Sequence, residues 1–227
     1  MENQINLPES LVSFDKHATI VGITGSGKTY FAGWFVRNKS KLNINSLYIT
    51  AKSETAEFVE NFDFATDDLW EAIEFIVKEN GSVYLELDYM AQEDLYKTLS
   101  LIEAYSDELI EDEIFKPMTV IVDEISLMVK HKLENSPSTQ ILGKAASTWR
   151  SKNIQLIAMS QRTSHIPATV VTQAEFHIIF NFNNAENNYL TKLYGKDNFN
   201  KIKSGVKNQY EFVEIQGNEV IQFSKVD

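Results

Sequence analysis

The feature that most constrains this chain is a glycine-rich segment, residues 22–29, which reads Gly-Ile-Thr-Gly-Ser-Gly-Lys-Thr. An apolar run with strand character, 18–23, leads into it, and a run with aromatic residues at helical spacing, 28–38, follows it. Glycines let backbone N–H groups turn inward around an anion, and the N-terminus of the following helix favours negative charge. The order strand, loop, helix therefore predicts a phosphate-binding loop in an α/β protein.

Each residue type in this loop has an expected role toward ATP. Lys28 is expected to reach the β- and γ-phosphates, and Thr29 is expected to ligate the accompanying Mg²⁺. A chance glycine-rich turn is the alternative, and the flanking strand and helix weigh against it. The remaining predicted nucleotide contacts are Gly22, Thr24, Gly25, Ser26, Gly27 and Tyr30.

Strand-like and helix-like segments alternate through most of the 227 residues, and no repeat or linker divides them. This pattern predicts a single α/β domain over residues 1–227, with a core at about 15–182 and a mainly parallel sheet carrying helices on both faces. The predicted strands are 18–23, 46–50, 82–87, 118–123, 154–160 and 176–182. The predicted helices are 28–38, 66–79, 92–110, 139–152 and 185–193.

The last part of the chain, 183–227, has a different pattern. Residues 183–207 are polar and rich in Asn and Lys, which predicts a helix followed by exposed loops. Two strand-like runs, 210–215 and 220–224, flank Gln216-Gly217-Asn218-Glu219, and they predict a tight hairpin with Gly-Asn as its central pair.

A second motif consists of two carboxylates at the end of an apolar strand. Residues 118–122 are apolar or β-branched, and Asp123 and Glu124 follow at the carboxyl end, where ligands of open α/β sheets bind. Asp123 is expected to hold Mg²⁺, and Glu124 is expected to polarise the attacking water. The alternative is a solvated turn that happens to begin with Asp-Glu. The intervening strands, which simple nucleotide kinases usually lack, favour hydrolysis over phosphate transfer to a metabolite.

A third apolar strand, 154–160, ends at Gln161 and Arg162, on the rim predicted for the first two motifs. Gln161 is expected to contact the γ-phosphate or its water, and a capping or loop residue is the alternative. The chain has three arginines, and Arg37 is expected to face solvent on the helix after the phosphate loop. Arg150 is therefore the first candidate, and Arg162 the second, for an arginine that enters a neighbouring subunit's site and stabilises transition-state charge. A surface arginine near a helix end is the alternative for Arg150.

The run 149–162, followed by Ile166-Pro167 and the strand 176–182, resembles the matching stretch of FtsK/HerA-superfamily ATPases. The resemblance covers about residues 18–225, and its three motif regions are diagnostic. It implies a RecA-like fold and ATP-driven translocation of double-stranded DNA, with Arg150 as the trans arginine finger and Gln161 as the sensor. The compact chain is most similar to genome-packaging ATPases of tectivirus-like icosahedral viruses that contain an internal membrane.

The resemblance also implies partners and a location. The expected assembly is a homo-oligomeric ring, a hexamer in this family, which acts on DNA of any sequence at the packaging vertex of the virion and in the host cytoplasm. Proteins of the capsid portal vertex or of the inner membrane are the expected partners. A DNA-pumping ATPase of a plasmid or conjugative element is the first alternative function, and a small-molecule kinase is the second.

Composition limits the remaining chemistry. The chain has no cysteine and four scattered histidines, which leaves the nucleotide's Mg²⁺ as the expected metal. No apolar run approaches the roughly 20 residues that span a bilayer, and the polar start predicts no secretory signal. The net charge of −11 disfavours a surface that coats nucleic acid, so DNA contact is expected from local lysines. The first candidates are Lys130 and Lys132, and the second set is Lys192, Lys196, Lys201, Lys203 and Lys207. For both sets the alternative is a solvated face.

Overall fold

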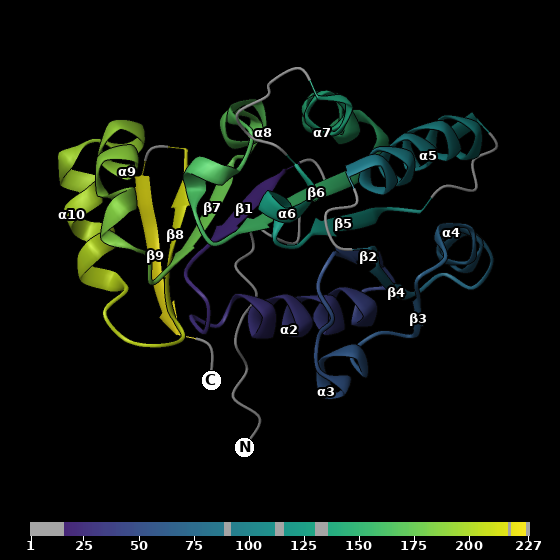
Figure 1. Cartoon of the computed structure of the whole chain (residues 1–227), viewed down its shortest axis with the longest axis horizontal. Coiled ribbons are helices and arrows are strands. Elements are labelled where there is room, and N and C mark those ends of the chain that lie inside the picture. Colours follow the sequence, from purple (N-terminus) through teal and green to yellow (C-terminus); the bar gives the residue numbers. More distant parts are fainter. Residues whose placement is uncertain (1–15, 89–91, 112–115, 130–135, 218, 226–227) are drawn as a thin grey trace.

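The computed structural model describes residues 16–88, 92–111, 116–129, 136–217 and 219–225 (Figure 1). Its strands form one sheet in the order β3-β4-β2-β5-β6-β1-β7-β8-β9. The neighbours from β3 to β7 pair in parallel, whereas β8 and β9 are antiparallel. The strands are β1 (Ala18–Val21), β2 (Asn45–Thr50), β3 (Phe64–Thr66), β4 (Ser82–Glu86), β5 (Met118–Val122), β6 (Ile154–Ser160), β7 (Phe176–Phe180), β8 (Glu211–Gln216) and β9 (Glu219–Lys225).

The helices cover both faces of this sheet. In Figure 1, α2 and α3 lie on one side, and α5, α7 and α8 lie on the other. The α-helices are α2 (Lys28–Lys41), α3 (Ala56–Val59), α4 (Leu69–Lys78), α5 (Gln92–Glu111), α6 (Ile125–Met128), α7 (Pro137–Thr148), α8 (Ala168–Gln173), α9 (Asn187–Tyr194) and α10 (Lys196–Gly205). Short 3₁₀ turns are Trp149–Lys152, Thr163–His165 and Asn184–Glu186.

Two apolar cores hold these layers together. The aromatic face of α2, with Phe31 and Phe35 fully buried, packs on one side of the strands around β1 and β7. The opposite side packs against α4, α5, α7 and α8, and its largest buried side chain is Trp149. Strands covered on both faces are mainly apolar: every residue of β6 is buried, and all are apolar except Gln155 and Ser160.

All six predicted strands are present, and the mainly parallel sheet with helices on both faces is confirmed. The strand β6 lies between β1 and β5, so the phosphate-loop strand and the Asp-Glu strand are not neighbours. Edge strand β3 was not predicted, because it has three residues and adjoins a helical pattern. The helix predicted from residue 66 begins after Asp68, whose carboxylate accepts hydrogen bonds from the N–H groups of Trp70 and Glu71.

The prediction of exposed loops after the first helix of 183–207 is wrong. Two helices, α9 and α10, follow one another there, separated by Gly195 at φ 81°. They bury Leu190, Tyr194 and Ile202 against β7 and β8 in a third apolar cluster. The apolar residues of α10 are too sparse to reveal this face in the sequence, because Ile202 is the one fully buried member.

The C-terminal hairpin is confirmed. Gln216 pairs with Glu219 across a two-residue connection, which matches the predicted central pair. Gly217 has a φ of 57°, in the left-handed region that glycine adopts freely, and Asn218 lies outside the described residues. Within the described ranges, no helix is both long and apolar enough to cross a membrane.

We expect Ile202→Ala to lower the free energy of unfolding by about 2–5 kcal/mol, because it leaves a cavity between α10 and β8. The exposed neighbour Lys201→Ala is the control and should change it by about 0.5 kcal/mol or less. Urea denaturation followed by circular dichroism measures both. Equal, small effects would show that α10 does not belong to the cooperative core.

Candidate functional site: a cleft at the carboxyl rim of the sheet

The glycine-rich loop is held between the ends of two strands. The Gly22 N–H donates to Ser160 O at 3.2 Å, and the Ile23 N–H donates to Asn181 O at 2.8 Å. A Cβ on Gly22 would lie 2.6 Å from the Phe180 Cβ, so this position requires glycine. Gly27 has a φ of 110° and directly precedes α2. The chain therefore turns back over the N-terminus of α2, as a phosphate cradle requires.

Within the loop, Lys28 and Ser26 have polar groups directed at the loop itself. The Lys28 Nζ donates to Gly22 O at 2.5 Å and to Ile23 O at 3.4 Å. Burial lowers the pKa of Lys28, although the charges of Asp123 and Glu124 oppose that shift. The Ser26 Oγ is buried and has no hydrogen-bond partner among the described residues. An anion in the loop would give the Ser26 hydroxyl a partner and would give Lys28 a negatively charged one.

Asp123 follows β5 and is 2% exposed. Its Oδ2 accepts a hydrogen bond from the Tyr48 hydroxyl at 2.6 Å, and its Oδ1 accepts one from the Glu124 N–H at 2.8 Å. Burial raises the pKa of Asp123, against the opposing effects of the Tyr48 hydrogen bond and the Lys52 charge. The carboxylate is therefore fixed in direction by groups on two neighbouring strands.

Glu124 is also buried, at 7% exposure, and it adopts the left-handed region with φ 43°. A non-glycine residue rarely takes this conformation, and such residues cluster at functional sites. Its Oε1 accepts hydrogen bonds from the Ser126 hydroxyl at 2.7 Å and from the Gln161 N–H at 3.4 Å. Glu124 is thus tied to the end of β6 as well as to β5.

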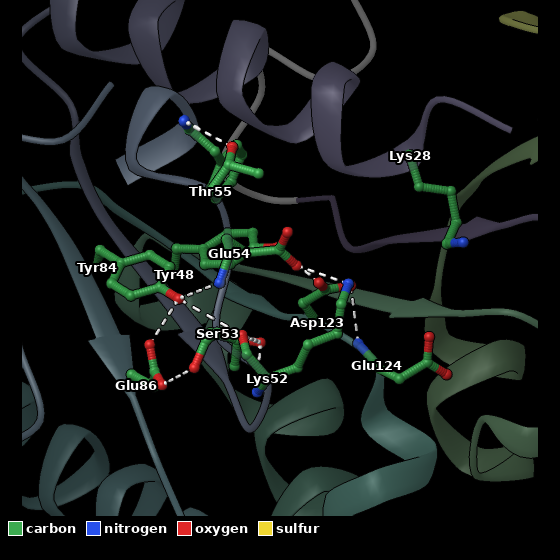
Figure 2. A network of polar contacts seen from close by, with 12 residues as sticks. Lys28, Tyr48, Lys52, Ser53, Glu54, Thr55, Tyr84, Glu86, Asp123 and Glu124 are labelled. Carbon is green, nitrogen blue, oxygen red and sulfur yellow. Dashed lines mark hydrogen bonds and ion pairs between the residues drawn. The ribbon is translucent and has the colours of Figure 1, made fainter. Parts of the chain in front are cut away.

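A second lysine, which sequence reasoning missed, lies beside these carboxylates (Figure 2). The Lys52 Nζ is 2.7 Å from Glu54 Oε1. Burial alone would lower the pKa of Lys52, but the hydrogen bond and charge of Glu54, with the charges of Asp123 and Glu124, raise it. Lys52 belongs to the loop after β2, the strand next to β5. Its position just after the carboxyl end of a predicted strand is the sequence signal that could have identified it as a site residue.

Hydrogen bonds to β4 fix the loop that carries Lys52. The Ser53 hydroxyl donates to Glu86 Oε1 at 2.5 Å, and the Glu54 N–H donates to the Tyr84 hydroxyl at 3.2 Å. Tyr84 in turn donates to Glu86 Oε2 at 3.1 Å, and its ring stacks on Tyr48 with centroids 5.9 Å apart. One polar network therefore connects β4, β2 and β5 next to Asp123, as Figure 2 shows.

The three predicted motifs meet in a single open cleft of about 680 Å³. Gln161 lines it as predicted, and Arg162 is exposed on the same rim, with its N–H 3.3 Å from the Ser160 hydroxyl. Gln209 and Tyr210, from the segment before β8, were not predicted for the site. The lining residues are Thr24, Gly25, Gly27, Lys28, Thr29, Tyr30, Lys52, Asp123, Glu124, Gln161, Gln209 and Tyr210.

Arg150 lies far from this cleft in its own chain. It is in the turn before β6, whose seven residues separate it from Gln161 by about 20 Å. Its Nη2 donates to Gln173 O, just before β7, which places it at the amino-terminal rim of the sheet. Its Nε is buried without a hydrogen-bond partner in the described part of the chain. Arg150 therefore cannot contact a ligand held by its own phosphate loop.

The two sets of lysines predicted for nucleic-acid contact differ in what the structure describes. Lys130 and Lys132 lie outside the described residues. The second set lies on α9, α10 and the loop that follows, and all of its members are exposed. No ion pair involves any of these five lysines within the described ranges.

No protein-family model matches the sequence, and no curated protein matches it. Solved structures do resemble the fold. The genome packaging NTPase B204 from Sulfolobus turreted icosahedral virus 2, in complex with ATP-γS, superposes with a TM-score of 0.73 at 19% identity, over 94% of this chain and 98% of that one. The pCW3 conjugation coupling protein TcpA, with ATPγS, gives 0.61 at 16% identity, over 93% of this chain and 60% of that one.

The cytoplasmic domain of the type VII secretion ATPase EccC from Thermomonospora curvata gives a TM-score of 0.65 at 14% identity, over 94% of this chain and 25% of that chain. At these identities the likeness establishes the fold, and the RecA-like P-loop fold expected from the sequence is confirmed. The proteins that share it include a viral packaging NTPase and a conjugation protein, the two kinds of ATPase that the sequence motifs resemble.

Proposed function

We propose that this chain hydrolyses ATP to move double-stranded DNA, and that its role is to package a viral genome into a preformed capsid. The observation that carries the proposal is the convergence of Lys28, Asp123, Glu124 and Gln161 in one cleft. The near full-length likeness to a viral genome packaging NTPase supports the choice of DNA as the substrate that is moved.

The cleft has the residues that a Mg²⁺–nucleotide complex needs. Mg²⁺ keeps several waters and binds through one or two protein oxygens together with substrate phosphates. Thr29 and Asp123 line the same cleft and supply a hydroxyl and a carboxylate. The partnerless Ser26 hydroxyl of the loop is a further sign that the cradle is built for an anion. Held by Thr29 and Asp123, Mg²⁺ would neutralise the negative charge that develops on the phosphates.

Different residues of the chain then have different roles in hydrolysis. Lys28 leaves the loop carbonyls to contact the β- and γ-phosphates, and Glu124 accepts a proton from the attacking water. The Gln161 N–H donates to Glu124, so a shift at the end of β6 changes the direction of that carboxylate. Gln161 thereby serves as a sensor that connects the state of the γ-phosphate to the rest of β6.

Arg150 supplies the remaining positive charge in a neighbouring subunit. Because it lies at the opposite rim of the sheet from its own cleft, it acts only where subunits pack with one rim against the next, as in a ring. Arg162 is the second candidate, on the cleft's own rim. A site completed by a neighbour makes each hydrolysis event depend on subunit geometry, which is what a translocating motor requires.

DNA contact is assigned to the five exposed lysines of α9, α10 and the following loop. Among the described residues their charges form no ion pairs, unlike those of Lys78 and Lys97, which pair with Glu74 and Glu93. Contact to phosphates by such lysines is independent of sequence and weakens sharply with salt. A DNA pump of a conjugative element is the second candidate function, favoured by the likeness to TcpA.

The first prediction from the proposed function concerns Tyr48→Phe, which removes the hydroxyl that orients Asp123. We expect the Mg²⁺ concentration for half-maximal ATP turnover to rise about 10-fold or more, because partners that orient a metal-binding carboxylate typically contribute 10–100-fold. Tyr84→Phe removes a hydroxyl of the same network that does not contact Asp123, and its Mg²⁺ midpoint should stay near that of the wild type. Identical midpoints in all three proteins would contradict the role of Tyr48.

The second prediction tests the trans arginine. Arg150→Ala should bind nucleotide and lose about 10³-fold or more in turnover, whereas Arg37→Ala, at an exposed position of α2, should be unaffected. Glu124→Gln should likewise bind ATP without hydrolysing it.

Mixing Arg150→Ala subunits with Lys28→Ala subunits, each inactive alone, should restore part of the activity. The Lys28→Ala subunits still provide an arginine to the intact phosphate loop of an Arg150→Ala neighbour.

If the Arg150→Ala variant keeps its ATP turnover, Arg150 does not contribute to the catalytic site. Loss of turnover without restoration in assembled mixtures would assign it a structural role in its own chain.

The third prediction concerns DNA. Long double-stranded DNA should stimulate turnover at low salt, and replacing Lys192, Lys201 and Lys203 with alanine should lower DNA affinity and reduce the slope of log affinity against log salt by roughly one per lysine. The matched control is Lys78→Ala with Lys97→Ala, whose lysines are ion-paired and exposed elsewhere. An unchanged salt slope in the triple lysine variant would place the DNA path on another surface. ATP turnover that DNA does not stimulate at any salt concentration would count against translocation.

A further inference from the structure

We propose that Tyr210, with Tyr30 beside it, forms the surface on which the nucleobase of the bound nucleotide stacks. This inference rests on the proposed function of the cleft as a nucleotide site. It assigns the part of the ligand that the phosphate loop does not reach, and it uses a segment far from every sequence motif.

Strand order explains how this segment reaches the cleft. The phosphate loop follows β1, which lies near the middle of the sheet, and Asp123 and Glu124 follow β5, two strands away on one side. On the other side come β7 and then β8, which runs antiparallel to β7. Because of that reversed direction, β8 begins where β7 ends, and the residues just before it lie at the carboxyl rim. The cleft therefore extends from Asp123 at one end to Tyr210 at the other.

The segment before β8 is fastened directly onto the phosphate loop. The Tyr210 N–H donates to Ser26 O at 3.1 Å, and the Gln209 Nε2 donates to Gly25 O at 3.0 Å. The Tyr210 ring packs on Gly27 so closely that a Cβ there would lie 2.6 Å from its Cδ1. Any ligand in the loop consequently lies next to this ring.

The backbone around Tyr210 is held in an unfavourable conformation. Tyr210 has a φ of 66°, in the left-handed region that bulky residues rarely adopt. Glu211 fixes the turn, because its carboxylate accepts hydrogen bonds from the Lys207 N–H at 3.1 Å and the Asn208 N–H at 2.8 Å. Strained residues held by their surroundings are characteristic of binding sites. Here the strain directs an aromatic ring at the mouth of the cleft.

The two rings are exposed where a base would lie. Tyr30 is 52% exposed and Tyr210 is 39% exposed, and their centroids are 6.4 Å apart. Both line the cleft. The strand order separates Tyr210, which precedes β8, from Asp123 and Glu124, which follow β5. A nucleotide whose γ-phosphate faces Glu124 therefore extends its base toward the rings. Stacking on an aromatic face is strong and tolerates any base, because every base has a π-face.

The Gln209 amide nitrogen donates to the Gly25 carbonyl, which fixes this side chain on the phosphate loop. Because stacking on a ring face does not distinguish the bases, we expect ATP and GTP to bind within a few-fold of one another.

Calorimetric titration of the full chain with ATP, GTP and inorganic triphosphate, each with Mg²⁺, tests the proposal. In Tyr210→Ala, ATP and GTP should bind about 5- to 150-fold more weakly, the range expected for loss of one stacking contact, whereas triphosphate should bind as in the wild type. Tyr210→Phe keeps the aromatic face and should retain affinity. Tyr210→Leu, which keeps bulk over Gly27 without a π-face, should resemble Tyr210→Ala. The exposed Tyr96→Ala on α5 is the control.

The outcomes separate this proposal from the one on which it rests. ATP affinity within two-fold of the wild type in both Tyr210→Ala and Tyr210→Leu would overturn base stacking. Equal weakening of ATP and triphosphate would also overturn it, because Tyr210 would then only support the loop. A Lys28→Ala variant that binds triphosphate normally would instead refute the phosphate site itself.

Discussion

The rest of the site depends on a charged carboxylate buried in the middle of the sheet. Asp123 is nearly inaccessible, and burial raises its pKa because the ionised form is costly in these surroundings. The Tyr48 hydroxyl, the Glu124 N–H and the charge of Lys52 offset part of that cost. Such an arrangement favours the binding of a cation, because a metal bound with nucleotide would stabilise the charge that the protein alone stabilises incompletely.

The direction of the strands then decides which residues share the cleft. Parallel strands β1, β5 and β6 bring the phosphate loop, the carboxylates and Gln161 to one rim. The same rule places Arg150, which precedes β6, at the other rim, away from its own cleft, as its proposed role in a neighbouring subunit requires. The antiparallel β8 is the exception that brings Tyr210 to the loop from the far end of the sequence. The proposed nucleotide site and the proposed contact between subunits thus depend on one topology.

Charge is distributed unevenly over this fold. The chain carries a net charge of −11, yet the lysines of α9 and α10 are exposed and without ion pairs in the described residues. These helices pack on β7 and β8, the strands beside the phosphate loop and the Tyr210 segment. Nucleotide bound against Tyr210 and DNA bound to α10 would therefore contact the same C-terminal unit. In the proposed motor, this proximity would connect hydrolysis to the movement of DNA.

The sequence by itself determined the phosphate loop, the Asp123-Glu124 motif and the alternating α/β pattern, because each is a local signal: glycine conformations, apolar strands and helical spacing. It also predicted Gln161 and the separate position of Arg150, since both flank a recognisable strand. Only the tertiary structure revealed Tyr48, Lys52 and Tyr210, whose roles come from strand neighbours distant in the chain. The helix α10 also escaped prediction, because a single fully buried isoleucine defines its packed face and its partner surface exists only after the sheet has formed.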